Sequence, residues 1–462
     1  MMDTVSGTQL MAGLLLGVIA LILLVLKTKV HAFVALLIAA SIAGIVGGMA
    51  PAAVADTISA GFGSTLASVG IIIGLGVMMG RILEVSGAAE TLAYALIRFV
   101  GKKKEEWAMG IAGFIVSIPI FVDSAFIILN PLVKSLSKKT GKSVIAIGVA
   151  LASGLVITHS LVPPTPGPLG VAGIFGVDIG IMIGLGLLFG IPLMIVGILY
   201  AKWLGNKIYQ LPDETSETGF IRPKEKVGYS ELLDAIDERE QTKELPSLML
   251  SLLPILVPII LIFLNTTLAA LELVDGFYGI LIFLGKPIIA VAIGLLFAIY
   301  GLARNLSRSE TLERMEEGIQ SAGIIILVTG AGGALGFVLR ENGAGDYIAN
   351  LIAELPLPAF LIPFFVASLV RLVQGSGTVA MITAASISAP ILSQMDVNMA
   401  LAAQAAAMGA LVFSYFNDSL FWVVNRMSGI TNVREQILVW SVPTTLMWFT
   451  GLIVLLIANM FM

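Results

Sequence analysis

Cysteine is absent from this 462-residue chain, and histidine occurs only at His31 and His159. Without cysteine there are no disulfides, thiolate metal sites or cysteine nucleophiles, and no HExxH zinc motif is present. Charge is scarce, since Asp, Glu, Lys and Arg make up 12% of the residues, against about 25% in globular domains. The GxxxxGK[ST] phosphate loop is missing too. These absences exclude a water-soluble enzyme and give no sign of a nucleotide-driven pump.

Long apolar runs take the place of these features, in a chain that is 58% hydrophobic with a mean hydropathy of +1.00. A bilayer crossing needs about 20 apolar residues. Runs of that length without Asp, Glu, Lys or Arg are 4–26, 30–55, 57–80, 143–177, 179–201, 245–271, 318–339, 397–417 and 436–462. The sequence therefore predicts an all-α polytopic membrane protein.

Positive charge, which favours the cytoplasmic side of a membrane, orients these runs. Lys27 and Lys29 place the first loop inside, and lysines at both ends of 107–133 place both ends of that apolar segment inside. A re-entrant hairpin satisfies this pattern, whereas a simple crossing does not. The resulting prediction has about ten crossings plus two hairpins, with both termini in the periplasm.

Two stretches about 255 residues apart resemble each other. The sequence from Gly80 to Leu96 aligns with that from Gly336 to Ile352, and similar offsets pair Gly154 with Gly409. In the charge-based topology the two copies are inverted, and inverted repeats with paired broken helices are typical of secondary transporters.

This repeat divides the chain into five regions. They are N-terminal helices at 1–55, a first inverted repeat at 56–201, a linker at 202–247, connecting helices at 248–303, and a second inverted repeat at 304–462. Each repeat is expected to hold one hairpin and one broken helix, at 107–133 and 143–177 in the first and at 355–395 and 397–430 in the second. Seventeen of the 56 charged residues lie at 202–244, which predicts a solvated cytoplasmic tether. Residues 230–244 within it have the pattern of a short amphipathic helix.

Polar residues at membrane depth are costly and tend to mark pathways, and four clusters of them interrupt the apolar runs. They are IPIFVDS, THSLVPPTPGP, RLVQGSGT and SYFNDS, two in each repeat. Broken helices expose N–H groups and a positive dipole end, which suits a carboxylate, while hydroxyls and amides suit a polyol. The residues expected to bind substrate are Asp123, Ser124, Thr158, His159, Ser160, Thr165, Arg371, Gln374, Gly375, Ser376, Gly377, Thr378, Asn417 and Asp418.

Structural roles are the alternative for several of these residues. Asp123 and Asp418 fit helix capping or an ion pair, His159 fits a core position, and Arg371 fits a partner for Asp396 or Glu341. For coupling, Asp123, His159 and Asp418 are titratable groups at depth, which favours protons, although a carboxylate beside freed carbonyls also suits sodium. No metal site, cofactor or nucleic-acid partner is expected.

The same stretches resemble the gluconate permease family of bacterial proton symporters. The most specific matches are THSLVPPTPGP and RLVQGSGTVA, and IPIFVDSAFIILNPLVKSLSKKTGKS, GAGGALGFVLRENGAGDYIA and SYFNDSLFWVV extend the likeness over both halves. The resemblance implies proton-coupled uptake of gluconate or a related sugar acid across the bacterial inner membrane, with D-serine as the alternative substrate. It also implies two re-entrant hairpins and two broken helices, and homodimers are frequent in the broader superfamily.

Rival classes are a passive channel, a membrane-embedded enzyme and an antiporter. Mid-membrane carboxylates count against an anion pore, and the missing catalytic set counts against an enzyme. Symport and antiport need the same polar site, so the sequence does not separate them.

Overall fold

The computed structural model describes residues 6–100, 104–213, 216, 219–223, 245–273, 275–344, 347, 358–415 and 418–462. Most of these residues are helical, and the predicted all-α membrane architecture is confirmed. Within the described ranges the one sheet is an antiparallel hairpin of β1 (Leu211–Pro212) and β2 (Phe220–Ile221). The helices, in chain order, are α1 (Gly7–Lys27), α2 (Ala32–Val46), α3 (Pro51–Val85), α4 (Ala88–Val100), α5 (Glu105–Val116), α6 (Val122–Thr140), α7 (Val144–Leu161), α8 (Pro166–Phe175), α9 (Ile179–Lys207), α11 (Leu248–Ala270), α12 (Phe277–Gly285), α13 (Pro287–Phe297), η1 (Ala298–Leu302), η2 (Ala303–Asn305), α14 (Arg308–Glu341), η3 (Ala359–Leu361), α16 (Ile362–Gln374), α17 (Gly377–Leu392), α18 (Met399–Gly409), α19 (Ser419–Met427), α20 (Val433–Gln436), η4 (Ile437–Ser441) and α21 (Val442–Ala458).

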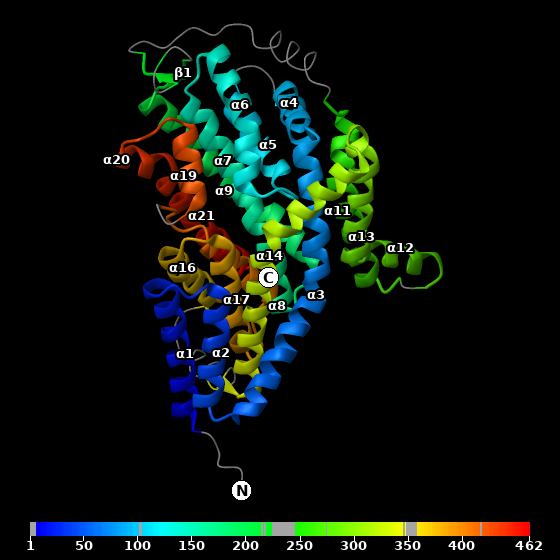
Figure 1. Cartoon of the computed structure of the whole chain (residues 1–462), viewed down its shortest axis with the longest axis vertical. Helices are drawn as coiled ribbons and strands as arrows, with labels where there is room; N and C mark the ends of the chain where they lie inside the picture. Colours follow the sequence, from blue (N-terminus) through cyan, green and yellow to red (C-terminus); the bar gives the residue numbers. More distant parts are fainter. Residues whose placement is uncertain are drawn as a thin grey trace.

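Two long helices, α3 and α14, cross the centre of the molecule side by side (Figure 1). They have 35 and 34 residues and open the two predicted repeats. Glycine allows their backbones to approach closely, because a Cβ added at Gly333 would lie 1.8 Å from Thr65 Oγ1 and one at Gly61 2.5 Å from Phe337 Cβ. Such small-residue contacts are the usual way in which helices associate in lipid.

Helix α7 lies at the core of the fold between α5 and α9. A Cβ at Gly154 of α7 would meet the carbonyl oxygen of Gly110 on α5 at 2.0 Å, and one at Gly186 of α9 would meet the carbonyl oxygen of Leu161 at 2.4 Å. Almost every α7 side chain is buried. A mostly apolar helix packed on all sides by protein explains why the sequence around 143–161 shows no amphipathic pattern.

Helical structure breaks at four places, two in each half. The breaks separate α5 from α6, α7 from α8, α16 from α17, and α18 from α19. Proline and glycine account for most of them: Pro119 lies in the first break, Pro163 and Pro164 in the second, and Gly375 has a left-handed φ of +89° in the third. The four breaks lie within the four segments that the sequence predicts as hairpins and broken helices.

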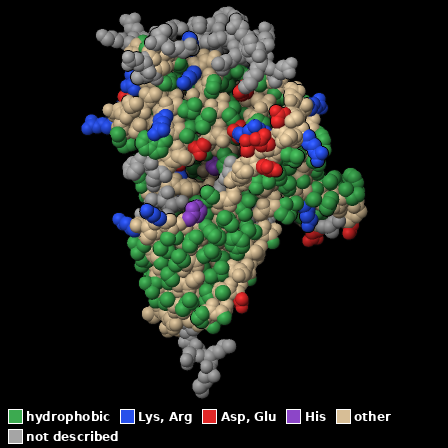
Figure 2. Space-filling view, viewed as in Figure 1, with side chains coloured by type: hydrophobic (Ala, Val, Ile, Leu, Met, Phe, Trp, Pro, Cys, Tyr) green, Lys and Arg blue, Asp and Glu red, His purple; other side chains and the backbone are tan. Residues whose placement is uncertain are grey.

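The outer face of the molecule is apolar over much of its surface (Figure 2). Large exposed hydrophobic side chains lie on α1, α9, α11, α13 and α21, among them Leu16, Leu188, Ile260 and Ile453. Six described helices are long and apolar enough to cross a membrane, or seven if the two parts of α3, bent by 45°, form one span. These features show a multi-pass membrane protein, and the count of about ten crossings stays a prediction.

The linker differs from the expected tether in its first part. Helix α9 continues to Lys207, and β1 and β2 form an antiparallel pair at the end of the helical body. Backbone and side-chain hydrogen bonds hold this piece, which charge content alone does not predict. The amphipathic pattern at 230–244 lies outside the described residues.

Candidate substrate site

The four breaks converge on one cavity of about 470 Å³. In Figure 2 the surface is hollowed at mid-height on the face shown. The cavity is lined by Phe121, Val122, Asp123, Val156, His159, Ser160, Arg371, Gly375, Ser376, Gly377, Thr378, Met381, Ala410, Asp418, Ser419 and Leu420. Its volume lies in the ~300–1,000 Å³ range of small-molecule sites. Both halves of the chain contribute to it.

Three helices begin at the cavity wall, namely α6, α17 and α19. Their first residues or N-caps, Val122, Ser376 and Asp418, all line the cavity. The first N–H groups of a helix have no partner within the helix, and the helix dipole places partial positive charge there. Three N-termini around one space therefore create a site for an anionic group.

Arg371, in the last turn of α16, links the second hairpin to the second broken helix. Its Nη1 donates to the carbonyl oxygen of Gly375, and its Nη2 donates to Asp418 Oδ2 at 2.7 Å. Only 7% of the residue is exposed, and its Nε is buried without a hydrogen-bond partner among the described residues. Arg371 thus shapes the hairpin tip and keeps one donor unused.

Asp418 is fully engaged. Besides Arg371, Oδ2 accepts from the Ser414 hydroxyl, and Oδ1 accepts from the N–H of Leu420 at 3.3 Å, which caps α19. From the sequence, Asp396 and Glu341 are the candidate partners of Arg371, whereas in the structure its partner is Asp418. The Asp418 carboxylate therefore ties Arg371 of α16 to the start of α19.

Asp123, in the first turn of α6, has a different environment. Its Oδ2 accepts from the Ser419 hydroxyl at 3.0 Å, which joins the first repeat to the second. Its Oδ1 is buried and unpartnered in the described part of the chain. Asp123 is therefore the cavity carboxylate that retains capacity for a proton or a ligand.

His159 ends the buried helix α7 at the cavity wall. Its Nδ1 is buried with no partner among the described residues, and its ring lies 5.8 Å from that of Phe121. Thr165 bonds the carbonyl oxygens of His159 and Val162 at 3.0 and 2.7 Å, which fixes the turn that follows. Asp123, His159 and Arg371 all line the cavity, and each has one buried polar atom without a partner among the described residues. Because buried polar atoms are rarely left unpaired, these three residues are the strongest candidates for contact with a ligand.

Comparisons with known proteins agree with this architecture. The chain is 15% identical to the YdaH transporter of Alcanivorax borkumensis, whose crystal structure it matches with a TM-score of 0.61 over 87% of this chain and 88% of that one. It is 56% identical to a Haemophilus influenzae protein described as a permease, over 97% of this chain and 92% of the relative. It is 34% identical to a gluconate permease of Pseudomonas aeruginosa over 98% of each. The GntP family permease model matches residues 9–461.

The chain belongs to the GntP permease family. The resemblance predicted from the motifs is thereby confirmed, and the protein is a multi-pass transporter of a small-molecule substrate, in a family of permeases and not of enzymes.

In this GntP permease the cavity brings together nine of the fourteen residues predicted to bind substrate. They are Asp123, His159, Ser160, Arg371, Gly375, Ser376, Gly377, Thr378 and Asp418. Ser124, Thr158 and Thr165 do not line it. Thr158 bonds the carbonyl oxygen of Gly154 at 3.4 Å, so both threonine hydroxyls serve the backbone of their own break. The side chain of Gln374 and all of Asn417 lie outside the described residues.

The sequence did not predict the apolar residues of the cavity wall or the contribution of the Ser419 hydroxyl. Phe121, Val122, Val156, Met381, Ala410 and Leu420 supply the apolar surface, and Ser419 holds Asp123. Ser419 lies in SYFNDS, one of the four polar clusters, so a signal for it existed. Apolar wall residues gave no signal, because nothing distinguishes them from ordinary core residues in so apolar a chain.

Proposed function

We propose that this GntP permease is a proton-coupled symporter that takes up gluconate or a related sugar acid across the bacterial inner membrane. The observation that carries the proposal is the cavity at which three helix N-termini and Arg371 surround a hydroxyl-lined space. A linear polyol with one terminal carboxylate matches both halves of that chemistry. The relatives support the same class, since Escherichia coli proteins named as a high-affinity gluconate transporter and an L-idonate transporter are 33% and 32% identical to this chain.

The substrate carboxylate is placed at the positive ends of α17 and α19, near Arg371. There it accepts from freed N–H groups and from the unused Arg371 Nε. The hydroxyls of Ser160, Ser376 and Thr378, which line the cavity, exchange hydrogen bonds with the polyol. Met381 and Phe121 cover its carbon chain and exclude water. Each of these hydrogen bonds replaces one that the substrate makes with water, so each adds little net free energy. Several together are needed for selective binding.

Asp123 is proposed as the main proton-carrying group, with His159 as the second. Asp418, the third group singled out by the sequence, is neutralised by Arg371 at 2.7 Å and is assigned to holding the hairpin tip in place. Protonation of Asp123 removes a negative charge from the cavity as the substrate anion arrives. Repulsion between the two anions thereby couples substrate binding to proton binding.

D-Serine is the alternative substrate of the same site. The observation that favours it is the unpartnered Asp123 Oδ1, which offers an ammonium group an acceptor. Gluconate has no cation and leaves that oxygen to a proton. The membrane side of the termini, placement in the inner membrane and assembly as a homodimer remain expectations from the sequence.

Uptake of labelled gluconate into proteoliposomes under an inward proton gradient tests the proposal. Accumulation that a protonophore abolishes, with idonate competing and D-serine not, is the expected result. Uptake that follows a sodium gradient at equal pH would replace the proton with sodium. Protonophore-sensitive uptake of D-serine without uptake of gluconate would make D-serine the substrate. Uptake that no ion gradient drives would reject the symporter mechanism.

A further inference from the structure

The β-hairpin of the linker is attached to the body by a dense polar network. We call the described residues of this segment, 208–213, 216 and 219–222, the clasp. It lies at the end of the molecule where α6 ends and α19 is followed by α20, in the upper left of Figure 1. None of its residues lines the cavity, so transport chemistry does not account for it.

One side of the clasp is fixed to the junction between α6 and α7 in the first repeat. The N–H of Val144 donates to the carbonyl oxygen of Gln210 at 2.9 Å, and the Ser143 hydroxyl donates to that of Ile208 at 2.8 Å. The Tyr209 hydroxyl donates to the carbonyl oxygen of Gly141 at 2.7 Å. These three bonds use the chain that immediately follows α6.

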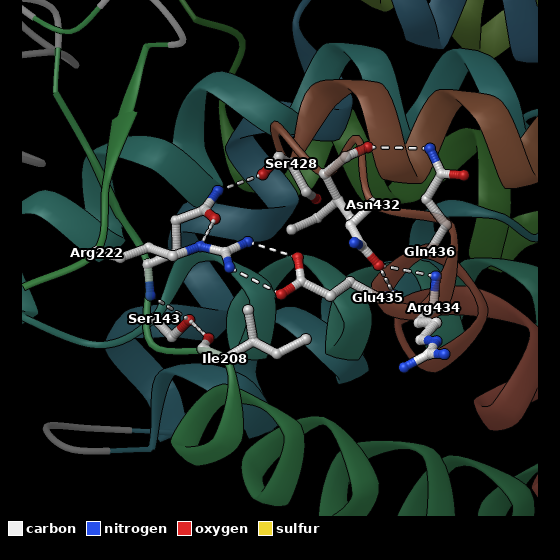
Figure 3. A network of polar contacts seen from close by, with 10 residues as sticks. Ser143, Ile208, Arg222, Ser428, Asn432, Arg434, Glu435 and Gln436 are labelled. Carbon is white, nitrogen blue, oxygen red and sulfur yellow. Dashed lines mark hydrogen bonds and ion pairs between the residues drawn. The ribbon is translucent and has the colours of Figure 1, made fainter.

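The other side is fixed to the turn after α19 in the second repeat (Figure 3). Gln210 Nε2 donates to the carbonyl oxygen of Ser428 at 2.6 Å, and its Oε1 accepts from Arg222 Nε at 2.9 Å. Arg222 completes a fork to both Glu435 oxygens at 2.8 and 2.6 Å. Hydrogen bonds to Glu435 raise the pKa of Arg222, so the bidentate pair keeps its charge at every physiological pH.

Phe220 supplies an apolar contact between the same two regions. Its ring lies against Gly429, where an added Cβ would meet it at 2.3 Å, and Lys134 of α6 lies over it at 5.0 Å. Gly429 also has a left-handed φ of +71°. Glycine is therefore required at position 429, both because of its left-handed backbone conformation and because of the Phe220 ring beside it.

Helices α6 and α19 pack against each other and both run from the cavity to the clasp. At the cavity they are joined by Asp123 and Ser419, 3.0 Å apart. At the far end they are joined by the clasp. The two helices that carry the cavity's carboxylates, one from each repeat, are thus tied at both ends.

We infer that the clasp is a positioning element, with Gln210, Arg222 and Glu435 keeping α6 and α19 aligned so that Asp123 stays within reach of Ser419. A 19-residue helix is about 28 Å long, so a pivot of about 3° at the clasp moves its other end by about 1.5 Å. That shift breaks a hydrogen bond of ordinary length. The inference rests on the proposed role of Asp123 in coupling, while the alignment itself does not depend on the substrate.

Spin labels measure the alignment directly, and the absence of cysteine means that no background labelling site must be removed. Ile127→Cys on α6 and Arg426→Cys on α19 place one label on an exposed position of each helix. We expect one narrow distance distribution in the parent chain and a broader or shifted one with Arg222→Gln or Glu435→Gln. Arg434→Gln is the matched control, because the Arg434 side chain points away from Glu435 in Figure 3, and it should leave the distribution unchanged.

Transport supplies the second readout, in the unlabelled chain. Arg222→Gln and Glu435→Gln should lower gradient-driven accumulation of gluconate at least about tenfold, since a misplacement of about 1 Å can cost up to about 100-fold at a reacting group, with gluconate exchange within about twofold. The swap Arg222→Glu with Glu435→Arg should restore much of the loss, which a general folding defect would not allow.

Unchanged distances and unchanged accumulation in both single variants would overturn the inference. An equal effect of Arg434→Gln would overturn it as well, since surface charge would then be the cause. If the parent chain accumulates no gluconate, the proposed function fails, and the spin-label distances still decide whether the clasp aligns the helices.

Discussion

The cavity and the clasp use the same kinds of side chain in opposite ways. At the clasp, Gln210, Arg222 and Glu435 satisfy one another. In the cavity, Asp123, His159 and Arg371 each keep a buried polar atom without a partner in the described part of the chain. Such atoms cost free energy. Among the described residues, unpaired polar atoms also occur away from the cavity, at Ser388, Gln404 and Trp440, so it is the combination of unpaired atoms with the cavity wall that points to a ligand site.

The contrast repeats within the cavity, between its two carboxylates. Asp418 accepts hydrogen bonds from Arg371, Ser414 and Leu420, whereas Asp123 accepts one from Ser419. The first should matter mainly for stability and the second mainly for coupling. Variants that separate stability from transport test this division.

The largest stability effect is expected for Asp418→Asn. The amide still caps α19 but leaves the Arg371 charge buried and uncompensated, which lowers the free energy of unfolding by about 3–5 kcal/mol. This loss of stability is measured by thermal unfolding in detergent, monitored as the fraction of protein that stays monodisperse as the temperature rises. Asp123→Asn is the matched control, with an expected change under about 1 kcal/mol. Equal midpoints for the two variants would contradict the division.

A paired site away from the cavity gives the next effect. Lys142 lies 2.8 Å from Glu105 and 2.5 Å from Glu106, two acids that are almost fully buried. Burial by itself would lower the pKa of Lys142, but its hydrogen bonds to both acids raise it. The stabilisation that Lys142 gains from its ion pairs with the two acids is therefore fully present at neutral pH, and it is lost only as pH rises through the raised pKa of Lys142.

Lys142→Met should lower the free energy of unfolding by about 2–3 kcal/mol at neutral pH. The parent chain should lose stability as pH rises through the raised pKa of Lys142, and the variant, which lacks that amine, should not show this loss. Unfolding midpoints from about pH 8 to about pH 11, with the parent chain alongside, measure the slope. An equal loss in both chains would show that Lys142 does not cause it.

Asp123→Asn should leave folding nearly unchanged and still reduce proton-driven accumulation of gluconate at least about tenfold. Exchange of labelled for unlabelled gluconate should survive, because it needs substrate binding without net proton movement. Ser124→Ala, next in the chain and absent from the cavity wall, is the control and should transport normally. Full accumulation by Asp123→Asn would assign coupling to another group.

The sequence predicted the breaks well because their causes are local. Pro119 removes a backbone donor, and Gly375 adopts a conformation that favours glycine, so each marks a helix end without knowledge of the fold. Polar residues in apolar runs likewise identified most of the cavity wall. Such signals depend only on neighbours in the chain.

Partners across the fold were not predictable in the same way. Arg371 pairs with Asp418, 47 residues away, and Asp123 pairs with Ser419, 296 residues away. Thr165 was expected at the substrate but bonds its own turn, since a threonine hydroxyl satisfies nearby carbonyls as readily as a ligand. The sequence did not predict the folded clasp, because its charges resemble those of any solvated loop. Only the fold brings Glu435 beside Arg222.

The smallest effect should come from single hydroxyls of the cavity wall. Thr378→Val should weaken gluconate binding about 2- to 10-fold, the value of one hydrogen bond, without loss of expressed protein. Ser376→Ala should weaken binding by a similar factor, but it also removes the cap that the Ser376 hydroxyl gives α17 by accepting from the N–H of Val379 at 3.3 Å. Thr158→Val is the matched control, because that hydroxyl bonds the Gly154 carbonyl oxygen inside α7, and its affinity should stay that of the parent chain. Equilibrium binding of labelled gluconate to purified protein measures all three. If Thr158→Val weakened binding as much as Thr378→Val, the distinction between hydroxyls that serve the backbone and hydroxyls left for a ligand would fail, and parent affinity in both cavity variants would remove the second hairpin tip from the site.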